Sequence, residues 1–181
     1  MSTVESQPHS DASSSAFRLF VVMGVAGSGK STIGEGVAAK IGGTYVDGDD
    51  LHPQANIDKM SAGEALTDED RWPWLTEVGR KLASIEGVAL IGCSALKRSY
   101  RQLISQQADE PVQFIYLDGS RNLIGSRMAA RKGHFMPTSL LDSQFATLEI
   151  PGSDENVFSV SIDATIEDII GTIAKHIAAQ R

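Results

Sequence analysis

One run of residues has the spacing of a phosphate-binding loop. Residues Gly24–Ser31 match the pattern G-x-x-x-x-G-K-[ST] at every fixed position. Glycines in such a loop let backbone N–H groups turn toward phosphate oxygens, because side chains there would clash. Lys30 would reach the β- and γ-phosphates as a cation, and the Ser31 hydroxyl is a hard oxygen ligand suited to Mg²⁺. The predicted nucleotide-binding residues of this loop are Ala26, Gly27, Ser28, Gly29, Lys30, Ser31 and Thr32.

The acidic run Asp47–Asp50 follows a short apolar segment and is the second candidate for chemistry. If the chain stays extended, Asp47 and Asp49 share one face. One carboxylate could then hold a Mg²⁺-bound water, while the other accepts a proton from a substrate hydroxyl. A solvated acidic turn is the alternative, and the position one strand after a phosphate loop favours the functional interpretation.

Two groups of cations come next along the chain. Arg71 follows three acids, so it could pair with them at the surface or grip an anionic substrate in a fork. Lys97 and Arg98 follow the predicted third strand and its small residues, which would allow a ligand to approach closely. Cys93, the single cysteine, is interpreted as a packing residue, since no partner for thiol chemistry is evident.

A basic segment farther along the chain suits a mobile lid over residues of about 125–140. Arg127 and Arg131 are four residues apart, which places them on one helical face, and Gly133 could act as a hinge. A lid of this kind would close on a triphosphate and exclude water. A solvated basic helix end is the alternative, and the predicted nucleotide site favours the lid.

The elements that must position these residues alternate between strands and helices. This alternation predicts a parallel sheet with helices on both faces and ligands beyond the carboxyl ends of the strands. The strands are expected at residues of about 18–23, 44–46, 88–91, 111–117 and 157–161. The helices are expected at residues of about 30–41, 53–62, 68–85, 97–107, 138–148 and 165–179, and a further helix from about 120 leads into the basic segment 127–134.

Composition limits the classes of partner. A chain of 181 residues fits one domain, expected over residues 17–181, and the polar, serine-rich residues 1–16 are expected to form a disordered tail. The net charge of −7 argues against a nucleic-acid binder. Since no apolar run is long enough to span a bilayer, and no signal-peptide pattern opens the sequence, we expect a soluble cytoplasmic protein without a membrane partner.

The chain resembles the small P-loop gluconate kinases over residues of about 18–175. The phosphate loop alone indicates only a nucleotide, whereas the ordered set of further blocks is specific to that family. The resemblance implies an α/β fold like that of the nucleoside monophosphate and shikimate kinases, a three-layer sandwich with strand order 2-3-1-4-5. The blocks are Gly24–Thr32, Asp47–His52, Asp70–Leu75, Cys93–Arg98 and Arg131–Met136, continued by Ser143–Phe145 and Leu148–Glu149.

The resemblance also implies an activity. The chain would use ATP and Mg²⁺ to phosphorylate the 6-hydroxyl of D-gluconate, giving 6-phospho-D-gluconate and ADP. Asp47 would then sit with Ser31 near the metal, and Asp49 would receive the proton of the substrate hydroxyl. Arg127 would stack on adenine opposite Asp163 and Ala164. The implied catalytic residues are Lys30, Asp49 and Arg131, and the implied gluconate contacts are Asp49, His52, Lys59, Arg71, Arg98, His134 and Gln144.

Other readings of the same residues stay open at this point. A kinase of another small hydroxylated metabolite, such as shikimate or adenylylsulfate, would use the same loop. A GTP switch or a non-catalytic nucleotide sensor would require a guanine-reading N-K-x-D motif, which the sequence lacks. An assembly ATPase would need an extra oligomerisation region, for which there is little room. A homodimer is the assembly that the resemblance implies, although the residues themselves leave the oligomeric state open.

Overall fold

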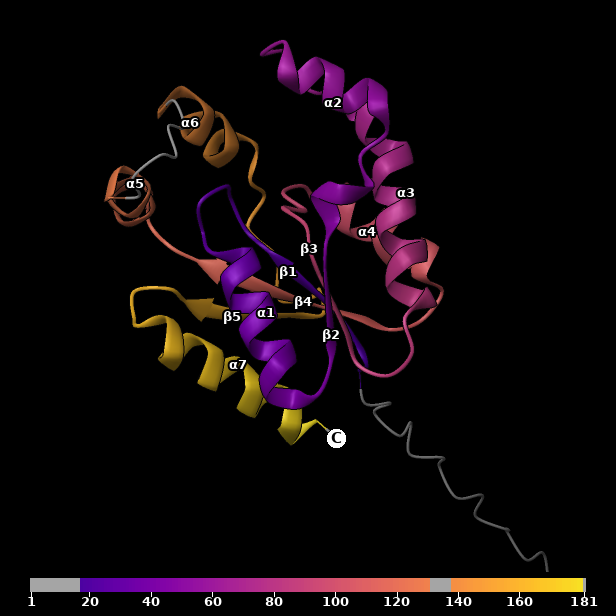
Figure 1. The fold of residues 1–181 in the computed structure, drawn as a ribbon, viewed down its shortest axis with the longest axis vertical. Coiled ribbons are helices and arrows are strands. Elements are labelled where there is room, and N and C mark those ends of the chain that lie inside the picture. Colours follow the sequence, from indigo (N-terminus) through magenta and orange to yellow (C-terminus); the bar gives the residue numbers. More distant parts are fainter. Residues whose placement is uncertain (1–16, 131–137, 181) are drawn as a thin grey trace, which may run out of the picture.

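The computed structural model describes residues 17–130 and 138–180 of the chain. Within these residues five strands alternate with seven α-helices (Figure 1). The expected tail, residues 1–16, and the segment 131–137 of the expected lid lie outside the described residues. The strands are β1 (Leu19–Met23), β2 (Thr44–Asp47), β3 (Ala89–Gly92), β4 (Val112–Asp118) and β5 (Val157–Ser161). The helices are α1 (Lys30–Ile41), the 3₁₀ turn η1 (Gly48–Leu51), α2 (Gln54–Ser61), α3 (Asp68–Ser84), α4 (Arg98–Ala108), α5 (Arg121–Ala130), α6 (Thr138–Thr147) and α7 (Ile166–Ala179).

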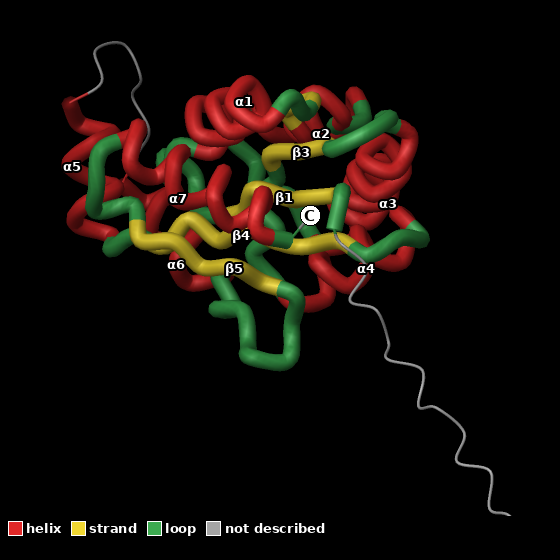
Figure 2. Tube along the Cα trace, turned by 90° about the horizontal axis from the view of Figure 1, so that it is seen from below, coloured by secondary structure: helices red, strands yellow, loops and turns green. Residues whose placement is uncertain are grey.

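The strands form one parallel sheet in the order β2-β3-β1-β4-β5, which confirms the predicted topology. The central strand β1 pairs with β3 on one side and β4 on the other, so that Val21 lies between Ile91 and Phe114. Figure 2 shows the sheet edge-on between its helices. Because all strands run the same way, their carboxyl ends lie at one edge, and the loops that follow β1, β2 and β3 meet there.

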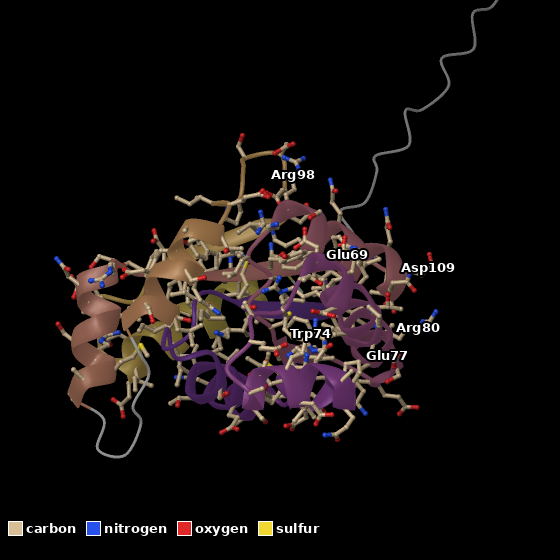
Figure 3. All side chains as sticks on the ribbon, turned by 90° about the horizontal axis from the view of Figure 1, so that it is seen from above. Glu69, Trp74, Glu77, Arg80, Arg98 and Asp109 are labelled. Carbon is tan, nitrogen blue, oxygen red and sulfur yellow. The ribbon has the colours of Figure 1, made fainter. Side chains whose placement is uncertain are left out.

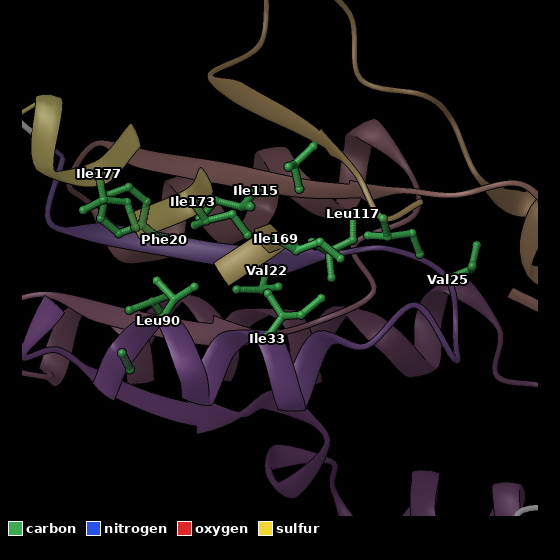
Figure 4. Close-up of a cluster of buried hydrophobic side chains, with 14 of the residues drawn as sticks. Phe20, Val22, Val25, Ile33, Leu90, Ile115, Leu117, Ile169, Ile173 and Ile177 are labelled. Atoms are coloured by element: carbon green, nitrogen blue, oxygen red, sulfur yellow. The ribbon is translucent and has the colours of Figure 1, made fainter. Parts of the chain in front are cut away.

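Alternating residues of β1 divide the core into two layers. Phe20 and Val22 pack with buried residues of α1 and α7, a cluster drawn in Figure 4. Leu19, Val21 and Met23 face the other way and pack with α3 and α4. Both faces of the strand are fully buried, as the continuous apolar run predicts for a parallel sheet covered by helices on both sides.

Two local signals end and begin helices where the sequence predicts. Gly42 terminates α1 in the left-handed conformation, with φ of 72°, and its N–H is donated to the Ala38 carbonyl. Thr67 caps α3 by accepting from the N–H of Asp70, whose carboxylate in turn accepts from the N–H of Thr67. This capping box fixes the start of α3 at the edge of the sheet where the carboxyl ends of the strands lie.

A single hydrogen bond joins α3 to the turn after β2. The indole Nε1 of Trp74 donates to the Gly48 carbonyl oxygen over 2.8 Å in a buried position. Gly48 has to be glycine, because an added Cβ would lie 2.4 Å from the Gly92 carbonyl oxygen of β3.

Among the described residues, no helix is both long enough and apolar enough to cross a membrane.

Candidate active site

The phosphate-binding loop joins β1 to α1 and depends on its glycines. Gly27 and Gly29 have φ of 81° and 96°, a region that side chains rarely adopt. At Gly27 an added Cβ would also lie 2.5 Å from the Met128 sulfur of α5. Gly29 occupies the N-cap of α1 without a side-chain cap, so the first N–H groups of the helix are left to bind an anion.

Lys30 lies against its own loop. Its Nζ donates to the carbonyl oxygens of Gly24 and Val25 over 3.1 and 3.0 Å. Burial lowers the pKa of Lys30, while the nearby carboxylates Asp49 and Asp47 act in the opposite direction. The ammonium therefore stands between the phosphate loop and the acidic turn after β2, as a cation for phosphoryl transfer must.

The two predicted carboxylates are brought together by a turn rather than by an extended strand. The expectation that Asp47 and Asp49 share a strand face is wrong, because β2 ends at Asp47 and the 3₁₀ turn begins at Gly48. Asp47 caps this turn by accepting from the N–H of Asp49 over 3.0 Å. Loss of solvation, followed by the charge of Asp47, raises the pKa of Asp49, and Lys30 and His52 oppose this rise.

Ser31 and Asp47 are the residues that would hold Mg²⁺. Both lie near the phenol of Tyr45. Burial is the main cause that raises the pKa of Tyr45 to about 12, while Ser31 lowers this pKa and the charge of Asp47 raises it. They come from the first turn of α1 and the end of β2, respectively. A hydroxyl and a carboxylate fit Mg²⁺, which keeps several waters and takes further oxygens from phosphates. The described residues contain no group of three or more His, Cys, Asp or Glu side chains arranged to hold a metal ion.

His52 is a second neighbour of Asp49, in addition to Lys30. Its ring stacks on Trp74 with centroids 4.0 Å apart, and its Nε2 is 3.9 Å from Asp49 Oδ1. Asn56, which is buried, donates from Nδ2 to His52 Nδ1 over 3.2 Å, so the proton of a neutral ring is assigned to Nε2, facing Asp49. Burial lowers the pKa of His52, and the charge of Arg71 lowers it further, while Asp49 opposes both. A neutral imidazole next to Asp49 can donate a hydrogen bond to a carboxylate or a sugar hydroxyl.

Arg71 belongs to a cationic cluster at the start of α3 and α4, which we define as Arg71, Lys97 and Tyr100 around Asp68. Arg71 Nη1 donates to the Tyr100 hydroxyl over 3.2 Å and lies 3.7 Å from Asp68 Oδ1. Lys97 Nζ lies 3.2 Å from Asp68 Oδ2, and the Tyr100 hydroxyl donates to Asp68 Oδ1. Both cations also lie over the Tyr100 ring, 5.5 and 5.6 Å from its centroid. Arg71, Lys97 and Tyr100 thus gather two cations and a hydroxyl around the single Asp68 carboxylate.

Two other predicted gluconate contacts are paired with acids elsewhere. Lys59 Nζ lies 2.8 Å from Asp70 Oδ2 and supports the start of α3. Arg98 forms two hydrogen bonds with Asp154, of 3.2 and 2.5 Å, in an exposed pair. Figure 3 shows Arg98 at the edge of the molecule, apart from Trp74. In this structure the Arg98 guanidinium is therefore paired with Asp154.

The remaining predicted residues lie beside the phosphate loop and α5. Gln144 of α6 accepts from the backbone N–H of Ala26 over 2.9 Å, so its observed contact is the loop itself. Arg127 Nη2 donates to the Ala164 carbonyl oxygen over 3.2 Å, which joins α5 to the loop after β5 that holds Asp163. The predicted residues Arg131 and His134 lie outside the described residues.

Comparison with known proteins places these features in a family. Residues 19–151 match the family model described as an AAA domain. The chain is 44% identical over 166 residues to a gluconokinase of Gluconobacter oxydans, covering 90% of this chain and 93% of that protein. It is also 44% identical over 158 residues to the thermoresistant gluconokinase of Escherichia coli, covering 85% and 90%. The chain belongs to the gluconokinase family.

Solved structures agree with this assignment. A gluconokinase from Sinorhizobium meliloti superposes with a TM-score of 0.82 at 44% identity, covering 89% of this chain and 91% of that one. Shikimate kinase from Aquifex aeolicus, with a TM-score of 0.55 at 14% identity, shares the fold alone. The prediction that the chain has a fold like that of the shikimate kinases is confirmed.

Three residues around this candidate site are not predicted from the sequence. Asp68 and Tyr100 are 32 positions apart, and nothing in either segment alone indicates that they share a hydrogen bond. Asn56 is buried and sets the tautomer of His52. The i and i+4 spacing of His52 and Asn56 was the available signal, although Pro53 makes the helix start ambiguous there.

Proposed function

We propose that the chain is an ATP-dependent gluconate kinase. It transfers the γ-phosphoryl group of ATP to the 6-hydroxyl of D-gluconate and releases 6-phospho-D-gluconate and ADP. The proposed catalytic unit is a single P-loop kinase domain over residues 17–181, with a lid at about 125–140. The proposed location is the cytoplasm. The proposed assembly is a homodimer, and light scattering after size-exclusion chromatography measures its mass.

The observation that supports the proposal is a series of groups, joined by contacts or by electrostatic interaction, that runs from the donor site to the anion site. Lys30 and Asp49 interact electrostatically at the phosphate loop, and Asp49 adjoins His52. His52 lies within reach of the charge of Arg71, and Arg71 contacts Tyr100 in the cationic cluster. A substrate that carries a hydroxyl at one end and a carboxylate at the other matches this order of groups.

Each residue then has one task in the transfer. Asp49 accepts the proton of the 6-hydroxyl as its oxygen attacks the γ-phosphorus and the bond to the β-phosphate oxygen breaks. Lys30 and the N–H groups of the loop stabilise the charge on the transferring group. Ser31 and Asp47 would hold Mg²⁺, which neutralises phosphate charge when bound. The cluster of Arg71, Lys97 and Tyr100 would bind the gluconate carboxylate.

Several proposed roles rest on the family rather than on observed contacts. Arg127 beside Ala164 is proposed to bind adenine, and Arg131 to meet the phosphates. His134, Lys59, Arg98 and Gln144 are retained as proposed gluconate contacts. For the last three, ligand binding would have to change the partners that each has in this structure.

A panel of acceptors tests the function. ADP release, coupled to NADH oxidation, is measured with D-gluconate, shikimate, adenylylsulfate and the neutral polyol sorbitol. We expect turnover with D-gluconate and none with sorbitol, which lacks the carboxylate. Turnover with shikimate or adenylylsulfate in its place would reassign the substrate, and tight ATP binding without turnover of any acceptor would indicate a nucleotide-binding switch.

A further inference from the structure

Arg101 of α4 is a buried arginine that the proposed mechanism does not use. It is 2% exposed, and every N–H group of its guanidinium has an acceptor. Nε and Nη2 donate to the two carboxylate oxygens of Glu155 over 2.8 and 3.2 Å. Nη1 donates to the carbonyl oxygens of Ala95 and Leu96 over 2.8 and 3.2 Å, and Nη2 donates to that of Glu149 over 3.1 Å.

The first segment that Arg101 holds is the loop between β3 and α4. Ala95 in this loop has φ of 46°, a left-handed conformation that is unfavourable for a residue with a side chain. Its carbonyl oxygen accepts the shorter of the two Nη1 bonds. The same loop leads directly into Lys97, whose ammonium reaches Asp68 in the cationic cluster. Arg101 therefore supports a strained turn that places a cation on the acceptor side.

The second segment is the chain that follows α6. The N–H of Glu149 donates to the Leu96 carbonyl oxygen over 2.8 Å, so this segment also pairs directly with the loop after β3. Glu155 is held in turn by the N–H of Gly152 over 2.9 Å. Helix α6, just before this segment, carries Gln144, which accepts from Ala26 of the phosphate loop. The segment is thus continuous with a helix that contacts the phosphate loop.

We propose that Arg101 is a positioning residue for phosphoryl transfer. It fixes the loop that carries Lys97 against the chain that follows α6, and so holds the acceptor cations at one distance from the phosphate loop. The inference rests on the proposed function. A buried ion pair is weak evidence for stability, since apolar residues of similar volume often replace one without loss. The planar fork of arginine, in contrast, is the group that can bond a carboxylate and three carbonyl oxygens at once.

Arg101→Lys is the principal test, because it keeps the charge and removes the fork. We expect kcat/KM for gluconate to fall by roughly 10²-fold, mostly through KM, as a small misplacement of binding groups can do. The dissociation constant of ATP, from fluorescence titration, is expected to change less than about threefold, because Lys30 and the loop glycines are untouched. Thermal denaturation confirms that the assay temperature lies below the unfolding transition of each variant.

Glu77→Gln is the control. Glu77 of α3 pairs with Arg80 of the same helix over 3.6 Å, and both side chains are exposed. An exposed ion pair contributes little, so we expect KM and kcat to stay within about twofold of the wild type. A lower melting temperature for Arg101→Lys, with both Michaelis constants unchanged, would show a purely structural role and overturn the inference.

Glu155→Gln carries the test if Arg101→Lys does not fold. It keeps the shape and one acceptor oxygen of the side chain, and it weakens the hold on the guanidinium. We expect a rise of about threefold to tenfold in the KM for gluconate, since a charge-assisted hydrogen bond is replaced by a neutral one. An unchanged KM would contradict the proposal. Failure of the wild type to phosphorylate gluconate would instead contradict the proposed function, so the two failures are distinguishable.

Discussion

The ring of His52 lies flat against the indole of Trp74, with centroids 4.0 Å apart and an angle of 17° between the planes. The same indole donates its N–H to the Gly48 carbonyl oxygen. One side chain of α3 therefore fixes both ends of the acidic turn after β2, with Asp49 between them. The position of the proposed base is set by packing from α3 as much as by the turn itself.

Trp74→Phe tests this arrangement. Phenylalanine keeps an aromatic face for His52 but leaves the buried Gly48 carbonyl oxygen without its donor, which costs about 1–3 kcal/mol. We expect a loss of that size in the free energy of unfolding from urea denaturation, together with a lower kcat. Trp72→Phe is the control, because Trp72 meets Tyr100 edge-on and is only half-buried. Equal effects of the two substitutions would contradict this role for Trp74.

Lys30→Ala is expected to remove nearly all turnover and leave the fold intact. The ammonium donates to two carbonyl oxygens of the phosphate loop and interacts with the charge of Asp49, and the loss of such a group costs at least about 10²-fold in kcat. Coupled ADP release measures the rate and circular dichroism the fold. Lys40→Ala, at the exposed last turn of the same helix, serves as control. A near-normal kcat for Lys30→Ala would refute the assignment of the loop.

Asp49→Asn is expected to lower kcat by about 10²- to 10⁴-fold, with a much smaller change in ATP affinity, because asparagine cannot accept the proton. Asp50→Asn is the neighbouring control. An equal loss in ATP affinity would assign Asp49 to the metal instead.

Arg71→Gln is expected to raise the KM for gluconate about tenfold or more and to leave the KM for ATP within about twofold, since a charge-assisted contact to the carboxylate is lost. Arg80→Gln is the control on the same helix. The Arg80 side chain is 62% exposed, and its Nη1 lies 3.6 Å from Glu77 Oε1. Figure 3 shows both residues at the edge of the molecule. A gluconate KM that Arg71→Gln leaves unchanged would remove the cluster from the acceptor site.

The bonds of Asp70 predict how stability depends on pH. Its hydrogen bond from Lys59, then that from the N–H of Thr67, lowers the pKa of Asp70 from 3.8 to about 2. A depressed pKa adds stability above the unfolded value, and this stability is lost as the pH falls through the folded value. Asp70→Asn should therefore melt below the wild type at pH 7, and the difference should shrink from about pH 4 toward pH 2. A constant difference would point to the lost capping box alone.

The elements were predictable because their signals are local. Continuous apolar runs indicate the buried strands, and Gly42 and Thr67 mark where α1 ends and α3 begins. The strand order came from the family resemblance, since no residue of β2 by itself indicates that it pairs with β3.

The details of the site were less predictable because they depend on distant contacts. The 3₁₀ turn after Asp47 follows from the close approach of Gly48 to β3. Arg98 donates to Asp154, 56 positions away, and not to a residue of the cationic cluster. The contacts of Arg101 could not be predicted either, since its partners come from two segments that only the folded chain brings together.

The contact between Gly27 and Met128 has a consequence for engineering this enzyme. Glycine-to-alanine changes are a common route to greater stability, because they restrict the unfolded chain. At position 27 an alanine would be unfavourable for two reasons. The backbone has φ of 81°, and the Met128 sulfur would lie 2.5 Å from the new methyl group. Libraries that vary α5 must therefore treat positions 27 and 128 as one unit, because a bulkier side chain at 128 would press directly on the loop that binds phosphate.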